Sequence, residues 1–279
     1  MANFDFDQAE GLRRMLAGPR PRIVTFLSAH AADDKGAMLV NLGASLARAG
    51  NDVVIVDACR TDYGVAERLG VAHGASLLQV ARQECALNEV VRQVPQGFAV
   101  ATMQRKTAAG QVCGADDARR LAKSFDVLVK QSGMVLVDGE FGADASFPVP
   151  IMDSAEIVVQ VGTSAASITA AYSLIKRLSQ QLGRRPFGVL VTGATEAEAQ
   201  LVYDNMCSAA SRYLAVQLTS MGSVPADEYL HRAARLGRAV VDAFPLAGAS
   251  VAFRQLAGRF ARAGMPPLGH AGGPSQFGV

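Results

Sequence analysis

The residues best placed for chemistry gather in one loop, between a short apolar run and a helical pattern. From Ser28 to Ala37 this loop reads SAHAADDKGA. Lys35 stands directly before the helical pattern, where the lysine of a phosphate-binding loop contacts the β and γ oxygens of a nucleotide. The next residue, Gly36, has no hydroxyl to offer Mg²⁺. We therefore interpret Lys35 and Gly36 as part of a vestigial nucleotide site.

Acidic residues stand where such a loop needs glycines. Glycines let backbone N–H groups wrap the phosphates, whereas here the stretch 31–34 reads AADD. The carboxylates of Asp33 and Asp34 would repel a triphosphate, most strongly at low effective dielectric. An ordinary strand-to-helix turn, with Asp33 or Asp34 capping the helix, fits the same residues. The loop alone leaves both interpretations open.

Three further polar residues end predicted strands and complete the candidate site. Asp57 closes VVIVD, Asp138 closes MVLVD and Thr192 closes FGVLVT. The carboxyl ends of parallel strands meet at the sheet edge where α/β proteins bind ligands. In a working NTPase one aspartate would position the attacking water and the other would support Mg²⁺. Capping of the turns that follow is the alternative role, so Asp57 and Asp138 are catalytic candidates only if the chain hydrolyses nucleotide.

Short apolar runs alternate with helical patterns along the chain, which is the signal for βαβ units. The predicted strands are Arg22–Ser28, Asp52–Asp57, Gly97–Met103, Met134–Asp138, Glu156–Val161, Phe187–Thr192 and Val216–Val224. The predicted helices are Gly36–Ala49, Asp116–Gln131, Ser167–Leu182, Glu196–Leu214, Asp227–Leu236 and Ala249–Ala263. Several strands lack polar alternation, as strands covered on both faces do. We predict one α/β domain over residues 22–263, with a doubly wound, mainly parallel sheet and helices on both faces.

Composition narrows the class of protein. The formal net charge is +2, which does not predict direct binding of nucleic acid. No run approaches the ~20 apolar residues of a transmembrane helix, and the first residues lack the apolar segment of a secretory signal. The four cysteines and four histidines are scattered, which disfavours a disulfide frame and a Cys/His metal site. We expect a cytoplasmic protein with reduced thiols.

The two ends of the chain differ from the predicted domain. Residues 1–21 combine an amphipathic helix pattern with GPRPR, whose prolines form a semi-rigid spacer. Residues 264–279 are rich in glycine and proline and are predicted to be disordered. The last predicted helix has an apolar stripe flanked by arginines, a pattern that fits either a helix covering the core or one lying on a membrane surface.

Four segments carry motifs of one family of ATPases. They are DQAEGLR at Asp7–Arg13, KGAMLVNLGASLA at Lys35–Ala47, AASITAAYSLIK at Ala165–Lys176 and GSVPADEYLHRAAR at Gly222–Arg235. On these segments the chain resembles the MinD/ParA (SIMIBI-class) P-loop ATPases. Within that group it resembles the flagellar-number regulators of the FlhG/FleN type, because the D-Q-A-x-x-L-R motif is not general among MinD and ParA proteins. The resemblance implies that Thr192 stands where the family commonly has an asparagine that reads the base.

The resemblance also implies partners. Family members use the N-terminal motif to stimulate FlhF, a flagellar GTPase, which would make Asp7, Gln8, Ala9, Leu12 and Arg13 partner-binding residues. Gln8 would help to order the catalytic water of the GTPase, a role that a glutamine can fill in trans. Flagellar switch-complex proteins and a flagellar transcription activator are the other implied partners, at the cell pole or flagellar base. An amphipathic helix that packs on its own domain is the alternative.

Departures from the family motif leave the enzymatic activity open. His30 replaces the signature lysine of the loop, Gly36 replaces its threonine, and Cys59 replaces the second aspartate of D-A-D. The expected protein is a regulator in which binding of ATP and Mg²⁺ and hydrolysis are weakened or lost. Two competitors are an active ATPase that relies on Lys35, Asp57 and Asp138, and a MinD-like accessory protein of another secretion machine, such as BcsQ of cellulose secretion.

Overall fold

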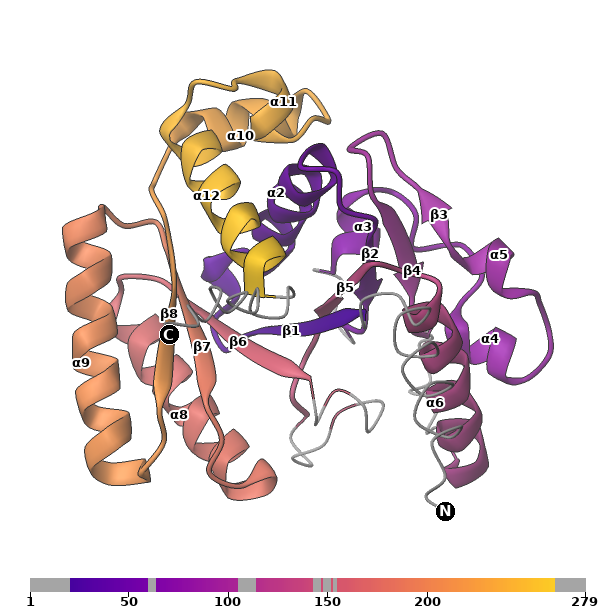
Figure 1. Cartoon of the computed structure of the whole chain (residues 1–279), viewed down its shortest axis with the longest axis horizontal. Coiled ribbons are helices and arrows are strands. Elements are labelled where there is room, and N and C mark those ends of the chain that lie inside the picture. Colours follow the sequence, from indigo (N-terminus) through magenta and orange to yellow (C-terminus); the bar gives the residue numbers. More distant parts are fainter. Residues whose placement is uncertain are drawn as a thin grey trace, which may run out of the picture.

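The computed structural model describes residues 21–59, 64–104, 114–142, 147, 152 and 155–263. Their centre is an eight-stranded sheet in the order β3-β4-β2-β5-β1-β6-β7-β8 (Figure 1). The strands are β1 Arg22–Ser28, β2 Val53–Asp57, β3 Arg92–Gln93, β4 Ala99–Thr102, β5 Met134–Asp138, β6 Glu156–Val161, β7 Phe187–Thr192 and β8 Leu218–Val224. Neighbouring strands pair in parallel except β3 and β4, which pair antiparallel.

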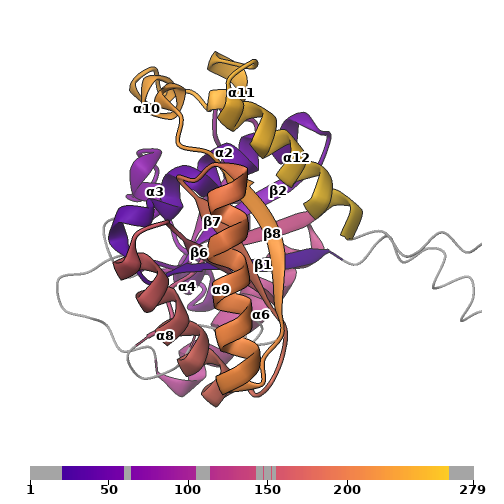
Figure 2. The ribbon, with the colours of Figure 1, turned by 90° about the vertical axis from the view of Figure 1, so that its left-hand side faces the viewer.

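Helices cover both faces of the sheet. The longer ones are α2 Lys35–Arg48, α6 Ala115–Lys130, α8 Ala165–Leu182, α9 Glu196–Leu214, α10 Glu228–Arg235 and α12 Gly248–Ala263, and the short ones are α3 Val65–Arg68, α4 Leu77–Ala81, α5 Leu87–Val90 and α11 Val240–Ala243. Alternate side chains of β1 point to opposite faces: Val24 and Phe26 pack under α2 and α12, and Leu27 packs toward α8. Figure 2 shows α2 and α12 on one side of the sheet and α8 on the other. Burial on both faces explains why the central strands are continuous apolar runs.

The predicted fold class is confirmed. The bounds predicted for β1, β5, β6, β7 and α9 agree with the structure, and the other predicted helices begin and end within two residues of the observed ones. Predicted strands at Asp52–Asp57, Gly97–Met103 and Val216–Val224 were one to two residues too long at one or both ends. Between β2 and β4 the prediction had no helix, and the structure has α3, α4 and α5 there. Helices of four or five residues are too short to show a helical period.

The last helix, α12, covers the core. Phe253, Leu256, Ala257 and Phe260 are at most 2% exposed and pack against α2 and the sheet. The Arg22 guanidinium lies 5.0 Å from the centre of the Phe260 ring and also pairs with Glu156, which connects the start of β1 to the end of α12. The apolar stripe therefore faces the domain rather than a membrane. Within the described ranges, none of the helices has the length and apolar character that crossing a membrane would require.

Several predictions fall on parts of the chain that the structure does not describe. The N-terminal activator motif, the spacer that follows it and the tail over 264–279 lie outside the described residues. The division of the chain at residues 21 and 263 therefore stays a prediction.

Candidate functional site

The loop between β1 and α2 forms a tight turn of its own. Residues Ala31–Asp33 make one 3₁₀ turn, and α2 begins directly afterwards at Lys35. Asp34, between them, adopts a left-handed conformation with φ of 45°. Its carboxylate accepts a hydrogen bond from the Ala37 N–H at 3.2 Å and pairs with Arg68. Asp34 thus caps α2, as the second interpretation of the loop expects.

Three amide groups of this loop donate hydrogen bonds within the loop itself. The His30 N–H donates to the Ser28 hydroxyl at 3.3 Å. The Asp33 N–H donates to the His30 carbonyl at 3.1 Å, and the Asp34 N–H donates to the Ala31 carbonyl at 3.3 Å. A glycine-rich phosphate loop instead points its N–H groups at the phosphates. In this conformation the loop backbone offers fewer N–H donors to an anion than a glycine-rich phosphate loop does.

The Asp33 carboxylate turns into the protein. Its Oδ2 accepts hydrogen bonds from the Ser28 hydroxyl at 3.1 Å and the Ser167 hydroxyl at 2.8 Å, and the side chain is 5% exposed. The Gln160 side-chain amide donates to the Asp33 carbonyl. Gly162 lies against the same carboxylate, since a Cβ there would be 2.8 Å from Asp33 Oδ1. These contacts hold a negative charge at the place where a phosphate loop is neutral.

Lys35 forms a buried ion pair. Its Nζ lies 2.7 Å from Asp138 Oδ1, donates to the Gly139 carbonyl and lies 3.7 Å from Cys59 Sγ. Burial alone would lower the pKa of Lys35, but the charge of Asp138, with smaller contributions from Cys59 and Glu140, outweighs it and raises that pKa above its usual value. The ammonium is therefore charged and its partner is within the chain.

The two aspartates accept hydrogen bonds from the backbone of Cys59 and of the first two residues of α3. Asp57 accepts from the N–H groups of Cys59 at 3.0 Å and Ala66 at 2.8 Å. Asp138 accepts from the Val65 N–H at 2.9 Å with the oxygen that Lys35 does not contact. Asp57 and Asp138 are 2% and 0% exposed. Both side chains act as caps in this structure, whatever further role they have.

Two carboxylates and a thiol form a cluster with metal-ligand spacing. The ligand atoms of Asp57, Cys59 and Asp138 all lie within 4.8 Å of one another. These residues do not fit Mg²⁺, which prefers oxygen ligands in an octahedral, partly hydrated shell. Burial, and secondarily the carboxylates nearby, raise the pKa of Cys59 far above its usual value despite the charge of Lys35, so the thiol stays protonated. The Lys35 ammonium already supplies positive charge to Asp138.

A cavity of about 850 Å³ opens beside the loop. His30, Asp33 and Asp34 form one side of it, and Thr192 lies at the end of β7. The Thr192 hydroxyl accepts a hydrogen bond from Gln160 at 3.1 Å. The structure thus divides the predicted site in two. Thr192 lines the cavity, whereas the other four residues of the predicted site are not part of its lining; these are Lys35, Gly36, Asp57 and Asp138.

Sequence reasoning missed several residues of this cavity. Gln160, next to the last residue of β6, is 0% exposed, and Gln96, before β4, is 9% exposed. A glutamine inside the apolar run EIVVQV is a usable signal, because a buried amide needs hydrogen-bond partners. Ser167 does not line the cavity but holds Asp33, and it gave no such signal, since this contact joins positions 134 residues apart.

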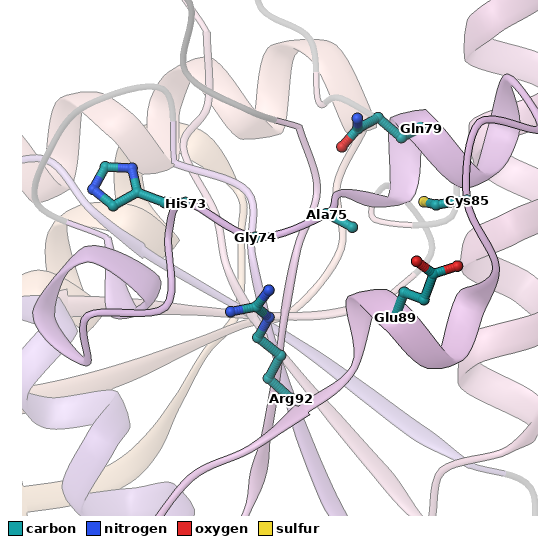
Figure 3. A pocket seen from close by; sticks show the side chains of 7 residues that line it. All are labelled: His73, Gly74, Ala75, Gln79, Cys85, Glu89 and Arg92. Carbon is teal, nitrogen blue, oxygen red and sulfur yellow. The ribbon is translucent and has the colours of Figure 1, made fainter.

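A second hollow, of about 590 Å³, lies around α4, α5 and β3 (Figure 3). The Arg92 side chain points toward the backbone at Gly74, where a Cβ would come within 2.6 Å of the guanidinium. Cys85 also lines the hollow, near Glu89, and burial together with the carboxylates of Glu89 and Glu84 raises the pKa of that thiol. None of the residues nominated from the sequence lines this hollow. The cavity beside the loop is therefore the candidate functional site.

Comparison with known proteins identifies one protein of similar sequence and several structures of similar fold. The chain is 29% identical over 237 residues to the antiactivator FleN of Pseudomonas aeruginosa, a match that covers 83% of this chain and 84% of FleN. The chain is thus similar to FleN over most of the length of both proteins. No model of a protein family matches the chain.

Several solved structures that resemble the chain are MinD and ParA proteins. The MinD cell division protein of Aquifex aeolicus matches 88% of this chain and 98% of its own, with a TM-score of 0.63 at 16% identity. A ParA family ATPase from Chlorobium tepidum matches 86% of this chain and 98% of its own, with a TM-score of 0.61 at 15% identity. At such identities the match shows the fold, which is the MinD/ParA-like P-loop NTPase fold. The predicted partner-binding residues Asp7, Gln8, Ala9, Leu12 and Arg13 lie outside the described residues.

Proposed function

We propose that the protein is a regulator of flagellar number or placement that acts by binding partners, with ATP binding and hydrolysis weakened or lost. The similarity to FleN over 83% of the chain supports the process. That relative's name, antiactivator, supports a flagellar transcription activator as one partner. The DQAEGLR segment at Asp7–Arg13 supports an FlhF-type GTPase as another. Switch-complex proteins complete the set, and the protein would act in the cytoplasm, peripherally at the cell pole or flagellar base.

The main support for weakened ATP binding and hydrolysis is the buried ion pair between Lys35 and Asp138, whose charged atoms lie 2.7 Å apart. A P-loop lysine must reach the β and γ phosphates. Freeing Lys35 would leave the Asp138 carboxylate buried without its counter-ion, which costs several kcal/mol. Asp34 adds a second obstacle, because its carboxylate already occupies the anion position at the N-terminus of α2.

Thermal unfolding with and without Mg·ATP tests whether ATP binding is weakened or lost. A ligand present at 100 times its Kd stabilises the native state by about 2.7 kcal/mol, which is a shift of roughly 5–10 °C in Tm for a domain of this size. We expect no resolvable shift at about 1 mM Mg·ATP, and no phosphate release. A shift of that size, with Mg²⁺-dependent turnover that Lys35→Ala abolishes, would favour the active ATPase instead.

A stimulation assay tests the partner-binding part. We expect the full chain to accelerate GTP hydrolysis by an FlhF-type GTPase, and Gln8→Ala to remove most of that acceleration at saturating protein, because the glutamine orders water in the transition state rather than docking the helix. Gln180→Ala, at an exposed position on α8, is the matched control and should change nothing. Stimulation that survives deletion of residues 1–20 would contradict the assignment. Absence of any stimulation would favour an accessory protein of another machine.

A further inference from the structure

A surface that combines arginines with aromatic side chains lies on α10, α11 and α12, which pack against one another (Figure 1). The Arg232 guanidinium lies 5.1 Å from the centre of the Tyr229 ring and 5.7 Å from that of the Phe244 ring. The two ring centres are 4.7 Å apart. Arg254 of α12 donates a hydrogen bond to the Pro245 carbonyl at 2.7 Å. These five residues form one connected surface, the α10–α12 surface.

Two leucines at the rim of the α10–α12 surface are largely exposed. Leu246, directly after Pro245, is 94% exposed, and Leu236, four residues after Arg232, is 60% exposed. Single exposed leucines are ordinary on a protein, but these two flank a stack of arginine and aromatic rings. Arginine and aromatic residues are enriched where proteins bind one another. The surface therefore has the composition of a docking site for a polypeptide segment.

The exposed charge of the α10–α12 surface is mostly positive. Within residues 228–254 four arginines are exposed, against the single exposed carboxylate of Glu228; the arginines are Arg232, Arg235, Arg238 and Arg254. Glu228 lies 3.7 Å from Arg232, and the half-buried Asp242 pairs with Arg48 of α2. In the part of the chain that the structure describes, the other three arginines have no carboxylate at ion-pair distance. The surface is therefore complementary to an acidic segment that also carries apolar side chains.

The chain itself contains such a segment close to its N-terminus, outside the described residues. Residues 4–10 read FDFDQAE, which places three carboxylates and two phenylalanines within seven positions. The arginines of the N-terminal stretch, Arg13, Arg14 and Arg20, all come after this segment. Residues 4–10 therefore complement the α10–α12 surface in charge and in apolar character.

The segment is long enough to reach this surface. The Arg22 guanidinium lies beside the Phe260 ring, so the described chain begins close to the C-terminal end of α12. The distance along α12 from Phe260 back to Gly248 is about 18 Å, at 1.5 Å per residue. Residues 10–20 span up to about 36 Å when extended. The tether between the domain and the acidic segment therefore covers the distance with length to spare.

We propose that residues 4–10 dock on the α10–α12 surface of the same molecule, with their carboxylates beside the arginines and their phenylalanine rings beside Leu236 and Leu246. The regulatory consequence rests on the proposed function, because Gln8 belongs to the docked segment and is withheld from the GTPase until the segment leaves. A short tether gives an effective concentration in the millimolar range. A contact with a Kd of about 0.1 mM is then docked about ten times more often than it is free.

A tryptophan reporter tests the contact, since the chain contains no tryptophan. Phe6→Trp in the full chain places the reporter inside the segment. We expect acrylamide to quench it at least about threefold less efficiently than it quenches a free peptide of residues 1–20 with the same substitution, because the tether favours the docked state. Dilution of the protein should not change this protection, since the contact lies within one molecule.

Reversal of charge on the α10–α12 surface should release the reporter. Arg235→Glu combined with Arg254→Glu turns attraction into repulsion, and quenching should rise close to that of the free peptide. Arg119→Glu combined with Arg120→Glu, at exposed positions on α6, is the matched control and should leave quenching unchanged.

A charge swap locates the contact. Asp5→Arg combined with Glu10→Arg should also release the reporter, and joining these changes to Arg235→Glu and Arg254→Glu should restore its protection. If the changes on the domain prevent folding, the two changes in the segment still decide. A reporter as exposed as in the peptide would overturn the proposal and leave the surface to a partner protein. Protection that ignores these charges, or that is lost on dilution, would overturn it as well.

GTPase stimulation separates this proposal from the proposed function. At sub-saturating protein, Arg235→Glu combined with Arg254→Glu should stimulate an FlhF-type GTPase more strongly than the unmodified chain does, because the segment is no longer withheld. A chain that stimulates no such GTPase contradicts the proposed function, whereas the quenching measurements still decide whether the segment docks.

Discussion

Replacing Lys35 by methionine should destabilise the fold strongly, although the residue occupies the place of a catalytic lysine. The substitution keeps an unbranched side chain but leaves the Asp138 carboxylate, 0% exposed, without the ammonium 2.7 Å away. Removal of one partner of a buried pair costs about 3–5 kcal/mol. Because Asp138 keeps its hydrogen bond from Val65, we expect the lower end, about 3 kcal/mol.

Far-UV circular dichroism during urea and thermal unfolding measures the effect, since the chain has no tryptophan to report by fluorescence. A loss of about 3 kcal/mol should lower Tm by roughly 6–12 °C in a domain of this size. Lys176→Met, at an exposed position on α8, is the matched control and should stay within about 0.5 kcal/mol of the wild type.

A double-mutant cycle separates the ion pair from other effects of the substitution. Asp138→Asn combined with Lys35→Met should be less destabilising than the sum of the single changes, with a coupling energy of about 1–3 kcal/mol. Equal stability of Lys35→Met and Lys176→Met would refute the reasoning, because it would mean that the Lys35 side chain is free in solution and available to a nucleotide.

Three further changes probe the same region and the core. Because the pKa of Cys59 is raised, the native thiol keeps its proton above pH 9.0, where the thiol of the unfolded chain loses it. The free energy of unfolding should therefore fall by about 1.4 kcal/mol per pH unit above pH 9.0. Cys59→Ala should reduce this pH dependence when urea midpoints are compared between pH 8 and pH 10. Gly64→Ala should cost about 1–3 kcal/mol in the same assay, because its Cβ would lie 2.2 Å from Asp57 Oδ2; an unchanged midpoint would mean that Asp57 does not cap α3 as described. Phe260→Ala should cost about 3–5 kcal/mol, since the ring is 0% exposed between Phe26 and Arg22, and a loss below about 1 kcal/mol would favour the membrane-surface interpretation of α12.

The layered fold was predictable because strands buried on both faces appear in the sequence as continuous apolar runs. Strands β1, β5, β6 and β7 lie in the middle of the sheet, and their apolar runs begin and end where the strands do. At the edges of the sheet the apolar pattern is weaker, because β3 has two exposed residues and β8 has exposed or half-buried residues between its buried ends. Short helices such as α3 owe their place to the Asp57 and Asp138 carboxylates that accept from their first amides, a tertiary cause that local periodicity does not carry.

The candidate site was predictable in its position but not in its state. Sequence reasoning placed Lys35, Asp57 and Asp138 at one edge of the sheet, and the structure brings them together with Cys59. The direction in which Lys35 points depends on Asp138, which is 103 residues away and is brought close by the parallel pairing of β1 with β5. The cavity was not foreseen because its walls come from β6, β7 and α10 as well as from the loop.

In the part of the site around Lys35, three groups that a nucleotide or its metal ion would contact have partners within the chain. The N-terminus of α2 receives the Asp34 carboxylate instead of a phosphate. Lys35 receives the Asp138 carboxylate, and Asp57 receives two backbone N–H groups instead of a hydrated metal ion. These interactions stabilise the chain without a ligand. Nucleotide binding at Lys35 would therefore require the chain to give up interactions that hold its own core together.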